Sequence, residues 1–233
     1  MVSGATEATG LTVIIDVFRA FSLECYLVDM GGSCIRPVGS LEEAEKWKSF
    51  APDCLLIGER GGKKCEGFDF GNSPSQVLPG SVFGKQIIHT TSAGTQGIVN
   101  AVHAKQIITG SLVNAKAIAT YILQQAPSCV SLVAMGNNGM SPAPEDELCS
   151  DYIAGILSGE PLPDMEERLS DLKYHGGEHF FNGDTQEIYP EQDFYLCTQL
   201  NRFDFILQIQ RDEFGLKSVP LWPDAIHDNS CLR

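Results

Sequence analysis

Charged and hydroxyl side chains follow the first apolar run of the chain at a spacing that suits phosphate chemistry. The run Leu11–Ile15 ends in Asp16, Arg19 follows three residues later, and Ser22 lies three residues beyond that. A carboxylate, a guanidinium and a hydroxyl near a helix N-terminus can together hold a metal ion and a phosphate group. A simpler arrangement stays open, in which Asp16 caps a loop and Arg19 is its ion-pair partner.

A glycine-rich loop with mixed charges follows the apolar run Cys54–Ile57. It extends from residue 58 to about Pro79 and opens with G-E-R-G-G-K-K-C-E-G-F-D-F-G-N-S-P. Glycines let backbone N–H groups approach a ligand closely. This is not a Walker A loop, because Lys63 stands where the second glycine is required. A plain surface loop is the alternative. The candidate ligand-binding residues of this loop are Glu59, Arg60, Glu66, Asn72 and Ser73.

Two later strand-end loops hold further candidates. The string T-T-S-A-G-T precedes a predicted helix, and its hydroxyls and glycine could cradle an anion, whereas a helix cap alone would use one hydroxyl. These candidates are Thr90, Thr91, Ser92, Gly94 and Thr95. Glu145 opens an acidic E-D-E run in the first turn of another predicted helix. The helix dipole alone accounts for such a run, and the alternative is that one or two carboxylates bind Mg²⁺.

The elements that must position these loops alternate between strand and helix. Residues 11–80 and 84–126 share the element order strand, loop, helix, strand, helix, and residues 129–158 add a third strand–helix unit. This alternation predicts a single α/β unit over residues 1–233, layered α/β/α, with a mixed, largely parallel sheet and two similar halves. The active-site cleft is expected at the carboxyl ends of the strands. We expect residues 159–233 to form a C-terminal extension that is turn-rich over residues 159–189 and has one late strand over residues 203–210.

Charge and hydropathy exclude several classes of function. With 16 Lys+Arg against 30 Asp+Glu the net charge is −14, which disfavours binding to nucleic acid. The N-terminus lacks the pattern of a signal peptide, and no stretch approaches the ~18–20 apolar residues of a membrane span. We therefore expect a soluble, cytoplasmic protein without a membrane partner. The apolar face of the predicted helix around residues 112–123 suits either a homodimer contact or core packing.

Taken together, the motifs resemble the 2-phosphosulfolactate phosphatase (ComB-like) family. The resemblance covers about residues 11–157, in the order I-D-V-x-R-A-x-S, V-G-S-L-E-E-A, G-E-R-G-G with E-G-F-D-x-G-N-S-P, T-T-x-x-G-T, G-S-L-x-N-A and E-D-E-L-C. It implies an α/β, Mg²⁺-dependent phosphatase that acts on the phosphate ester of a small sulfonated hydroxy acid in a coenzyme M pathway. The family's usual T-T-T-N-G-T-R is T-T-S-A-G-T-Q here, so the phosphatase class is better supported than the substrate.

On this basis we predict the roles of the candidate residues. The predicted catalytic residues are Asp16, Arg19, Glu59 and Arg60. The predicted Mg²⁺ ligands are Asp16, Glu59, Glu66 and Glu145. The predicted substrate-binding residues are Ser22, Asn72, Ser73, Thr90, Thr91, Ser92, Gly94 and Thr95. Asp16 could be a metal ligand or a nucleophile that forms an aspartyl phosphate. The alternative function is a non-catalytic phosphate- or nucleotide-binding regulatory module.

Overall fold

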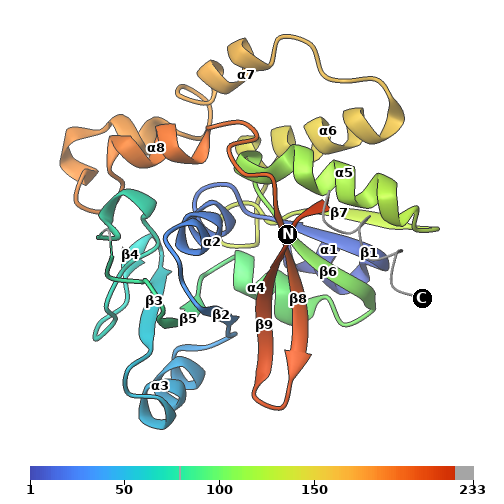
Figure 1. Cartoon of the computed structure of the whole chain (residues 1–233). Coiled ribbons are helices and arrows are strands. Elements are labelled where there is room, and N and C mark those ends of the chain that lie inside the picture. The colour runs from blue at the N-terminus through green and yellow to red at the C-terminus, as the bar shows by residue number, and fades with distance from the viewer. Residues whose placement is uncertain (79, 224–233) are drawn as a thin grey trace.

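The computed structural model describes residues 1–78 and 80–223, and within them nine strands form one sheet in the order β4-β3-β5-β2-β9-β8-β6-β1-β7 (Figure 1). The strands are β1 Gly10–Ile15, β2 Cys34–Pro37, β3 Leu55–Arg60, β4 Lys63–Lys64, β5 Gln86–Thr90, β6 Ala104–Gly110, β7 Val130–Ala134, β8 Ile206–Asp212 and β9 Gly215–Leu221. Pro79, in the predicted glycine-rich loop, and residues 224–233, in the predicted extension, lie outside the described residues.

The sheet is mixed and contains two parallel groups of three strands. Strand β5 pairs in parallel with β2 and β3, and β1 pairs in parallel with β6 and β7. The β8–β9 hairpin joins the two groups through antiparallel pairs with β6 and β2. Strand β5, the first of the predicted second half, therefore lies between two strands of the first half, and β1 lies between β6 of the second half and β7 of the third unit. This interlocking makes the halves inseparable as folded units, whereas their similarity to each other stays a prediction.

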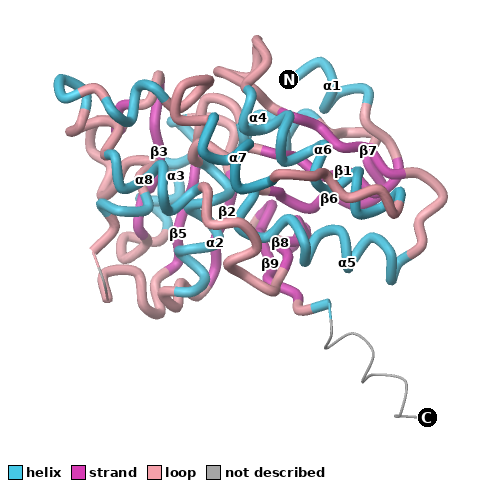
Figure 2. The backbone as a smooth tube through the Cα atoms, turned by 90° about the horizontal axis from the view of Figure 1, so that it is seen from above, coloured by secondary structure: helices cyan, strands magenta, loops and turns pink. Residues whose placement is uncertain are grey.

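Helices cover both faces of the sheet, as the predicted α/β/α layering requires. The helices are α1 Val2–Glu7, α2 Ala20–Asp29, α3 Leu41–Phe50, α4 Gly94–Asn100, α5 Ala115–Gln125, α6 Pro144–Ser158, α7 Met165–Asp171 and α8 Glu191–Cys197. Strand β1 shows how the layers form, because successive side chains of a strand point to opposite faces. Val13 and Ile15 pack in the cluster that includes α5 and α6, and Ile14 packs in the cluster that includes α1 and α4. Figure 2 shows β1 between α1 and α5.

Local sequence signals explain several element boundaries. Ser40 caps α3, since its Oγ accepts a hydrogen bond from Glu43 N at 3.1 Å, and the Glu43 carboxylate accepts one from Gly39 N at 3.2 Å. Helix α2 begins at Ala20, with Arg19 at its N-cap, so Ser22 lies in the first turn of the helix. Strand β9 was not predicted. It contains Pro220, which is unfavourable within a strand pattern.

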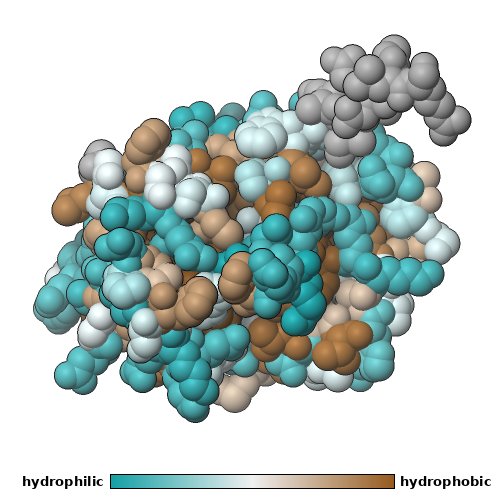
Figure 3. All heavy atoms as spheres, turned by 60° about the horizontal axis from the view of Figure 1, so that its bottom comes forward, coloured by the Kyte–Doolittle hydropathy of each residue, from teal (hydrophilic) through white to brown (hydrophobic). Residues whose placement is uncertain are grey.

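Helix α5, which covers the segment expected either at a dimer contact or in the core, packs in the core. Residues 112–114 form a 3₁₀ turn, η2, and α5 buries most of its apolar side chains, whereas Leu123 is exposed. On the face shown in Figure 3, brown hydrophobic patches are interspersed with teal hydrophilic ones. The homodimer stays a prediction. Among the described residues, no helix is both long enough and apolar enough to cross a lipid bilayer.

Candidate active site

The loops that follow β1, β3, β5 and β7 line one cavity of about 360 Å³. Asp16 follows β1, Gly61 follows β3, Ser92 follows β5, and Gly136 follows β7, so both parallel groups of strands contribute to the cavity. The predicted cleft at the carboxyl ends of the strands is confirmed. The first turn of α6 and the segment before α8 complete the wall.

Asp16 is one of the buried carboxyl groups of this cavity. It is 6% exposed, and its Oδ1 accepts a hydrogen bond from Ala20 N at 3.2 Å. A side chain at position 94 would crowd it, because a Cβ there would lie 2.9 Å from Asp16 Oδ2, so Gly94 makes room for this carboxylate. Burial, together with the nearby charges of Asp146 and Glu59, raises the pKa of Asp16 to about 8.

Two carboxyl groups from the first turn of α6 face the same cavity. The Asp146 carboxylate accepts hydrogen bonds from Val17 N and Gly136 N, both at 2.7 Å, and so ties the loop after β1 to the loop after β7. Glu145 is 5% exposed, and its Oε2 has no hydrogen-bond partner among the described residues. Burial is the main cause that raises the pKa of each group to about 7. The cavity thus holds carboxyl groups whose negative charges are poorly compensated.

Glu59 is fixed at the opposite wall by three hydrogen bonds. Its Oε2 accepts from Gly62 N at 2.7 Å and from Ser92 Oγ at 3.1 Å, and its Oε1 accepts from Ser92 N at 2.6 Å. These bonds join the loop after β3 to the loop after β5. Glu59 therefore lies in the cavity as predicted, and its bonds show that it also organises the two loops around it.

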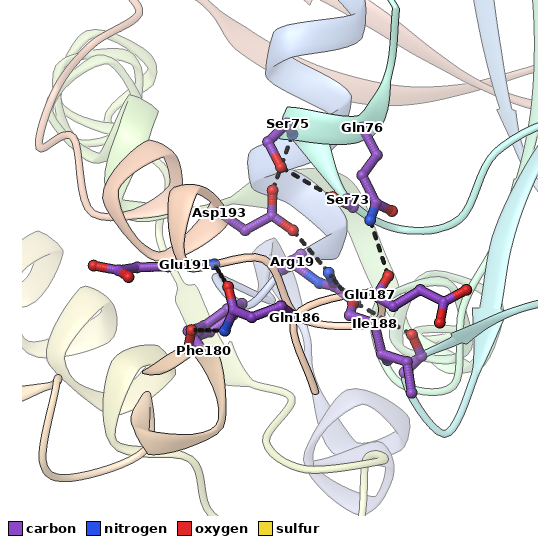
Figure 4. Close-up of polar contacts among 11 residues, drawn as sticks. Arg19, Ser73, Ser75, Gln76, Phe180, Gln186, Glu187, Ile188, Glu191 and Asp193 are labelled. Carbon is purple, nitrogen blue, oxygen red and sulfur yellow. Dashed lines mark hydrogen bonds and ion pairs between the residues drawn. The ribbon is translucent and has the colours of Figure 1, made fainter. Parts of the chain in front are cut away.

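Arg19 lines the cavity, and its guanidinium forms hydrogen bonds with residues of the C-terminal third of the chain (Figure 4). Its Nη1 donates to Asp193 Oδ2 and to Ile188 O, both at 2.8 Å, and its Nη2 donates to Gly62 O at 3.3 Å. The Tyr189 ring lies over the guanidinium at 4.9 Å from its centroid. Arg19 and Asp193 form a buried ion pair, with 3% and 0% of their side chains exposed. The predicted ion pair of Arg19 exists, but its partner is Asp193 rather than Asp16.

Comparison with known proteins identifies the family. The family model for 2-phosphosulpholactate phosphatase matches residues 2–212. The chain belongs to this family. A probable 2-phosphosulfolactate phosphatase from Caldicellulosiruptor saccharolyticus is 36% identical over 76% of this chain and 74% of its own length. One from Bacillus subtilis is 29% identical over 87% of this chain and 88% of its own, and one from Carboxydothermus hydrogenoformans is 33% identical over 83% and 84%.

Membership of the 2-phosphosulpholactate phosphatase family confirms the predicted family and enzyme class, a phosphoric monoester hydrolase. It also changes the interpretation of the C-terminal third. Because the family model extends to residue 212, most of the predicted extension 159–233 lies within the family's own length. This agrees with the geometry, since His179 and Tyr189 line the cavity and Asp193 holds Arg19.

Several predicted site residues do not reach the cavity, because the fold engages them elsewhere. Arg60 donates from Nη2 to Thr90 Oγ1 at 2.9 Å and from Nη1 to the carbonyl oxygen of Glu59 at 2.6 Å. Glu66 is exposed at the surface and does not line the cavity, so the structure does not bring it together with the other predicted metal ligands. Ser73 lines a neighbouring cavity instead.

The hydroxyl residues of the predicted anion cradle are mainly structural in this family member. Thr91 and Thr95 bond each other, since Thr91 Oγ1 accepts from Thr95 N at 3.1 Å and Thr95 Oγ1 accepts from Thr91 N at 2.9 Å. Ser22 Oγ donates to Val17 O at 2.7 Å and lies 2.6 Å from Ser111 Oγ, fully buried. Ser92 is the one hydroxyl residue of this loop that lines the cavity among the described residues. Ser22, Thr90, Thr91 and Thr95 are therefore buried outside the wall of this cavity, and their contacts with substrate stay predictions.

Asn72 lines the cavity as predicted and is oriented by a buried network. Its Oδ1 lies 3.2 Å from His89 Nε2, and His89 Nδ1 lies 2.8 Å from Glu24 Oε1. Glu24 Oε2 in turn accepts a hydrogen bond from Ser218 Oγ at 3.0 Å. In this arrangement His89 holds one end of the Asn72 side-chain amide, and the other end is left for a ligand. Sequence reasoning did not find His89, because a histidine inside an apolar strand gives no local sign of its partners.

Proposed function

We propose that this protein is a Mg²⁺-dependent phosphatase that hydrolyses the phosphate monoester of a small acidic metabolite, with 2-phosphosulfolactate as the first candidate substrate. The proposal is carried by one observation in a chain of this phosphatase family. Glu145 Oε2 has no hydrogen-bond partner among the described residues and lines the same cavity as the buried Asp16. The predicted cytoplasmic location and the place in coenzyme M biosynthesis belong to the same proposal.

The carboxyl groups fit a divalent cation by a chemical test. Three buried acids whose pKa values are raised by burial and by one another need positive charge when they ionise. Within residues 1–78 and 80–223, no three His, Cys, Asp or Glu side chains form a ready-made metal cluster. The proposal of Mg²⁺ rests on the carboxyl groups themselves, because this ion usually binds through one or two carboxylates together with waters and substrate phosphate oxygens. Asp16 and Glu145 would hold it, because both oxygens of Asp146 and of Glu59 already accept hydrogen bonds.

Each part of the cavity has a task in the proposed hydrolysis. Bound Mg²⁺ would supply Lewis-acid stabilisation of the phosphoryl oxygens. Asn72 would donate its amide N–H to an oxygen of the ester, and Arg19 would keep the wall of the cavity in place. Asp16 would either take a proton from an attacking water or attack phosphorus itself, with the alkoxide leaving in both routes. Both routes require the Asp16 carboxylate.

The test measures phosphate release from 2-phosphosulfolactate and from p-nitrophenyl phosphate, with Mg²⁺ and with EDTA. We expect EDTA to abolish turnover, and Asp16→Asn and Glu145→Gln each to lower kcat by about 100-fold or more. Both variants should fold, because burial disfavours the charged form that they remove. Glu147→Gln is the matched control, since Glu147 lies in the same turn of α6 but is exposed. Full Mg²⁺-dependent activity of Asp16→Asn would show that the assigned role of Asp16 is wrong.

A further inference from the structure

A second cavity of about 350 Å³ adjoins the first one. The two cavities share three wall residues, Arg19, Gly62 and Asn72, so they lie next to each other. Figure 4 shows part of the wall of the second cavity, where Gln76 Nε2 donates to Glu187 O at 2.9 Å and Arg19 Nη1 donates to Ile188 O. A substrate that fills both cavities would pass these shared residues.

The two cavities have opposite charge. The first cavity is lined by four acidic side chains, Asp16, Glu59, Glu145 and Asp146. The second is lined by Lys63 and Lys64 of β4, with Glu187 as its acidic residue among the described ones. Both lysines are exposed, and neither forms an ion pair with a carboxylate of residues 1–78 and 80–223.

Arg19 cannot supply the positive charge of the second cavity, because Asp193 already balances it at 2.8 Å. The net positive charge therefore comes from Lys63 and Lys64. In a chain with a net charge of −14, two adjacent unpaired lysines beside an acidic cavity form a local region that can attract an anion. The side chain of Lys64 begins against Gly71, another residue of the cavity wall.

Neutral hydrogen-bond donors complete the second cavity. Ser73 is 2% exposed, and its Oγ has only a long contact of 3.4 Å to Ser75 Oγ. One end of the Asn72 side-chain amide is held by His89, which leaves the other end for a ligand between the two cavities. A hydroxyl and an amide N–H beside lysine ammonium groups suit the oxygens of a second acidic group.

We propose that the second cavity binds a second acidic group, sulfonate or carboxylate, of the same substrate whose phosphate occupies the first cavity. This inference rests on the proposed function. It assigns Lys63 and Lys64 as specificity-determining residues and explains how an acidic protein selects a substrate with several negative charges. Esters without a second acidic group would bind in the first cavity alone.

The experiment compares the wild-type protein with the double variant Lys63→Gln/Lys64→Gln on three esters. These are 2-phosphosulfolactate, 2-phospholactate, which lacks the sulfonate, and p-nitrophenyl phosphate, which has neither acidic group. We expect KM for 2-phosphosulfolactate to rise by about tenfold or more with kcat nearly unchanged, and both constants for p-nitrophenyl phosphate to stay within about twofold. A rise in KM for 2-phospholactate as well identifies the carboxylate as the bound group, whereas a rise for 2-phosphosulfolactate alone identifies the sulfonate.

The control is Lys85→Gln/Lys116→Gln, which removes two exposed lysines that do not line either cavity. It lowers the net charge equally, so it separates a local contact from long-range attraction. An equal rise in KM for the control, or no rise in the test variant, would overturn the proposed binding role of the second cavity. The phosphatase proposal would still stand.

A binding measurement keeps the inference testable if no ester is hydrolysed. Calorimetry with sulfolactate as the probe should then give at least tenfold weaker binding to Lys63→Gln/Lys64→Gln than to the wild type. Equal binding would overturn the assignment. Lys63→Arg/Lys64→Arg should restore most of the affinity, because it restores the charge.

Discussion

At the scale of single residues, the candidate site depends on Asp193, a buried carboxylate that lies outside the strand-end motifs. Asp193 is fully buried, accepts from Arg19 Nη1 through Oδ2, and accepts from Ser75 N through Oδ1 at 2.9 Å. Asp193→Asn removes this charge and leaves the Arg19 guanidinium buried without a counter-charge. We expect the free energy of unfolding to fall by about 3–5 kcal/mol, measured by urea denaturation.

The control for this variant is Asp171→Asn. Asp171 pairs with His175 at 3.0 Å, but both side chains are more than half exposed, so its loss should cost less than about 0.5 kcal/mol. A similar small loss for Asp193→Asn would mean that other groups compensate the charge of Arg19.

The same scale shows which site residues could be predicted from the sequence. Asp16, Glu59 and Glu145 lie in one cavity, as the prediction requires, because a carboxylate at a strand end or at a helix start has few positions open to it. Arg60 and Ser22 do not line this cavity. Their side chains bond residues from distant segments, Thr90 and Ser111, and the sequence does not reveal these partners. Asp193 was missed for the same reason, since its helix gives no sign that it packs against Arg19.

At the scale of elements, the site needs close contact between β3 and β5. Gly58 of β3 pairs with Thr90 of β5, and a Cβ at position 58 would overlap the backbone oxygen of Thr90. Gly58→Ala should therefore push the strands apart next to Glu59, which joins their loops. We expect a loss of about 1–3 kcal/mol in unfolding free energy and a parallel loss of activity.

Gly183→Ala is the matched control for Gly58→Ala. A Cβ at position 183 would have no heavy atom within 4 Å, so the change in unfolding free energy should stay within about 0.5 kcal/mol. Unchanged stability and activity of Gly58→Ala would show that the two strands can separate without harm to the site.

Element prediction succeeded where the pattern is local and failed where tertiary contacts decide. Strand β1, helix α3 and helix α6 were predicted because apolar runs and caps mark them directly. Helix α8 has seven residues and lies in a turn-rich region, so its pattern is too short to read. Strand β9 was missed because Pro220 weakens the pattern and its partner β8 stabilises it.

At the scale of the whole molecule, the sequence predicts the layers but not the neighbours in the sheet. The α/β/α class follows from the alternation of elements. The position of β1 between β6 and β7, and of β5 between β2 and β3, does not, because hydrophobic patterns carry no information on which strands pair. This interlocking, together with the β8–β9 hairpin, brings the loops of both parallel groups to one cavity.

The crowding of acids in that cavity gives the molecule a distinctive dependence on pH. Burial, with neighbouring charges, raises the pKa of Asp16 to about 8 and those of Glu145 and Asp146 to about 7, whereas the unfolded chain has ordinary values near 4. Between about pH 4 and pH 8 the folded state holds protons that the unfolded state releases. These groups therefore make the protein less stable as pH rises through this window, without metal.

Mg²⁺ should reverse this trend, because it binds the ionised carboxylates of the folded state and not the unfolded chain. The rise in melting temperature on adding Mg²⁺, relative to EDTA, should be small near pH 5 and should grow up to about pH 8. Asp16→Asn should lose most of this increment, whereas Glu147→Gln should keep it, since Glu147 is exposed. An increment that is equal at pH 5 and pH 8, or equal in Asp16→Asn and the wild type, would place any bound Mg²⁺ away from this cavity.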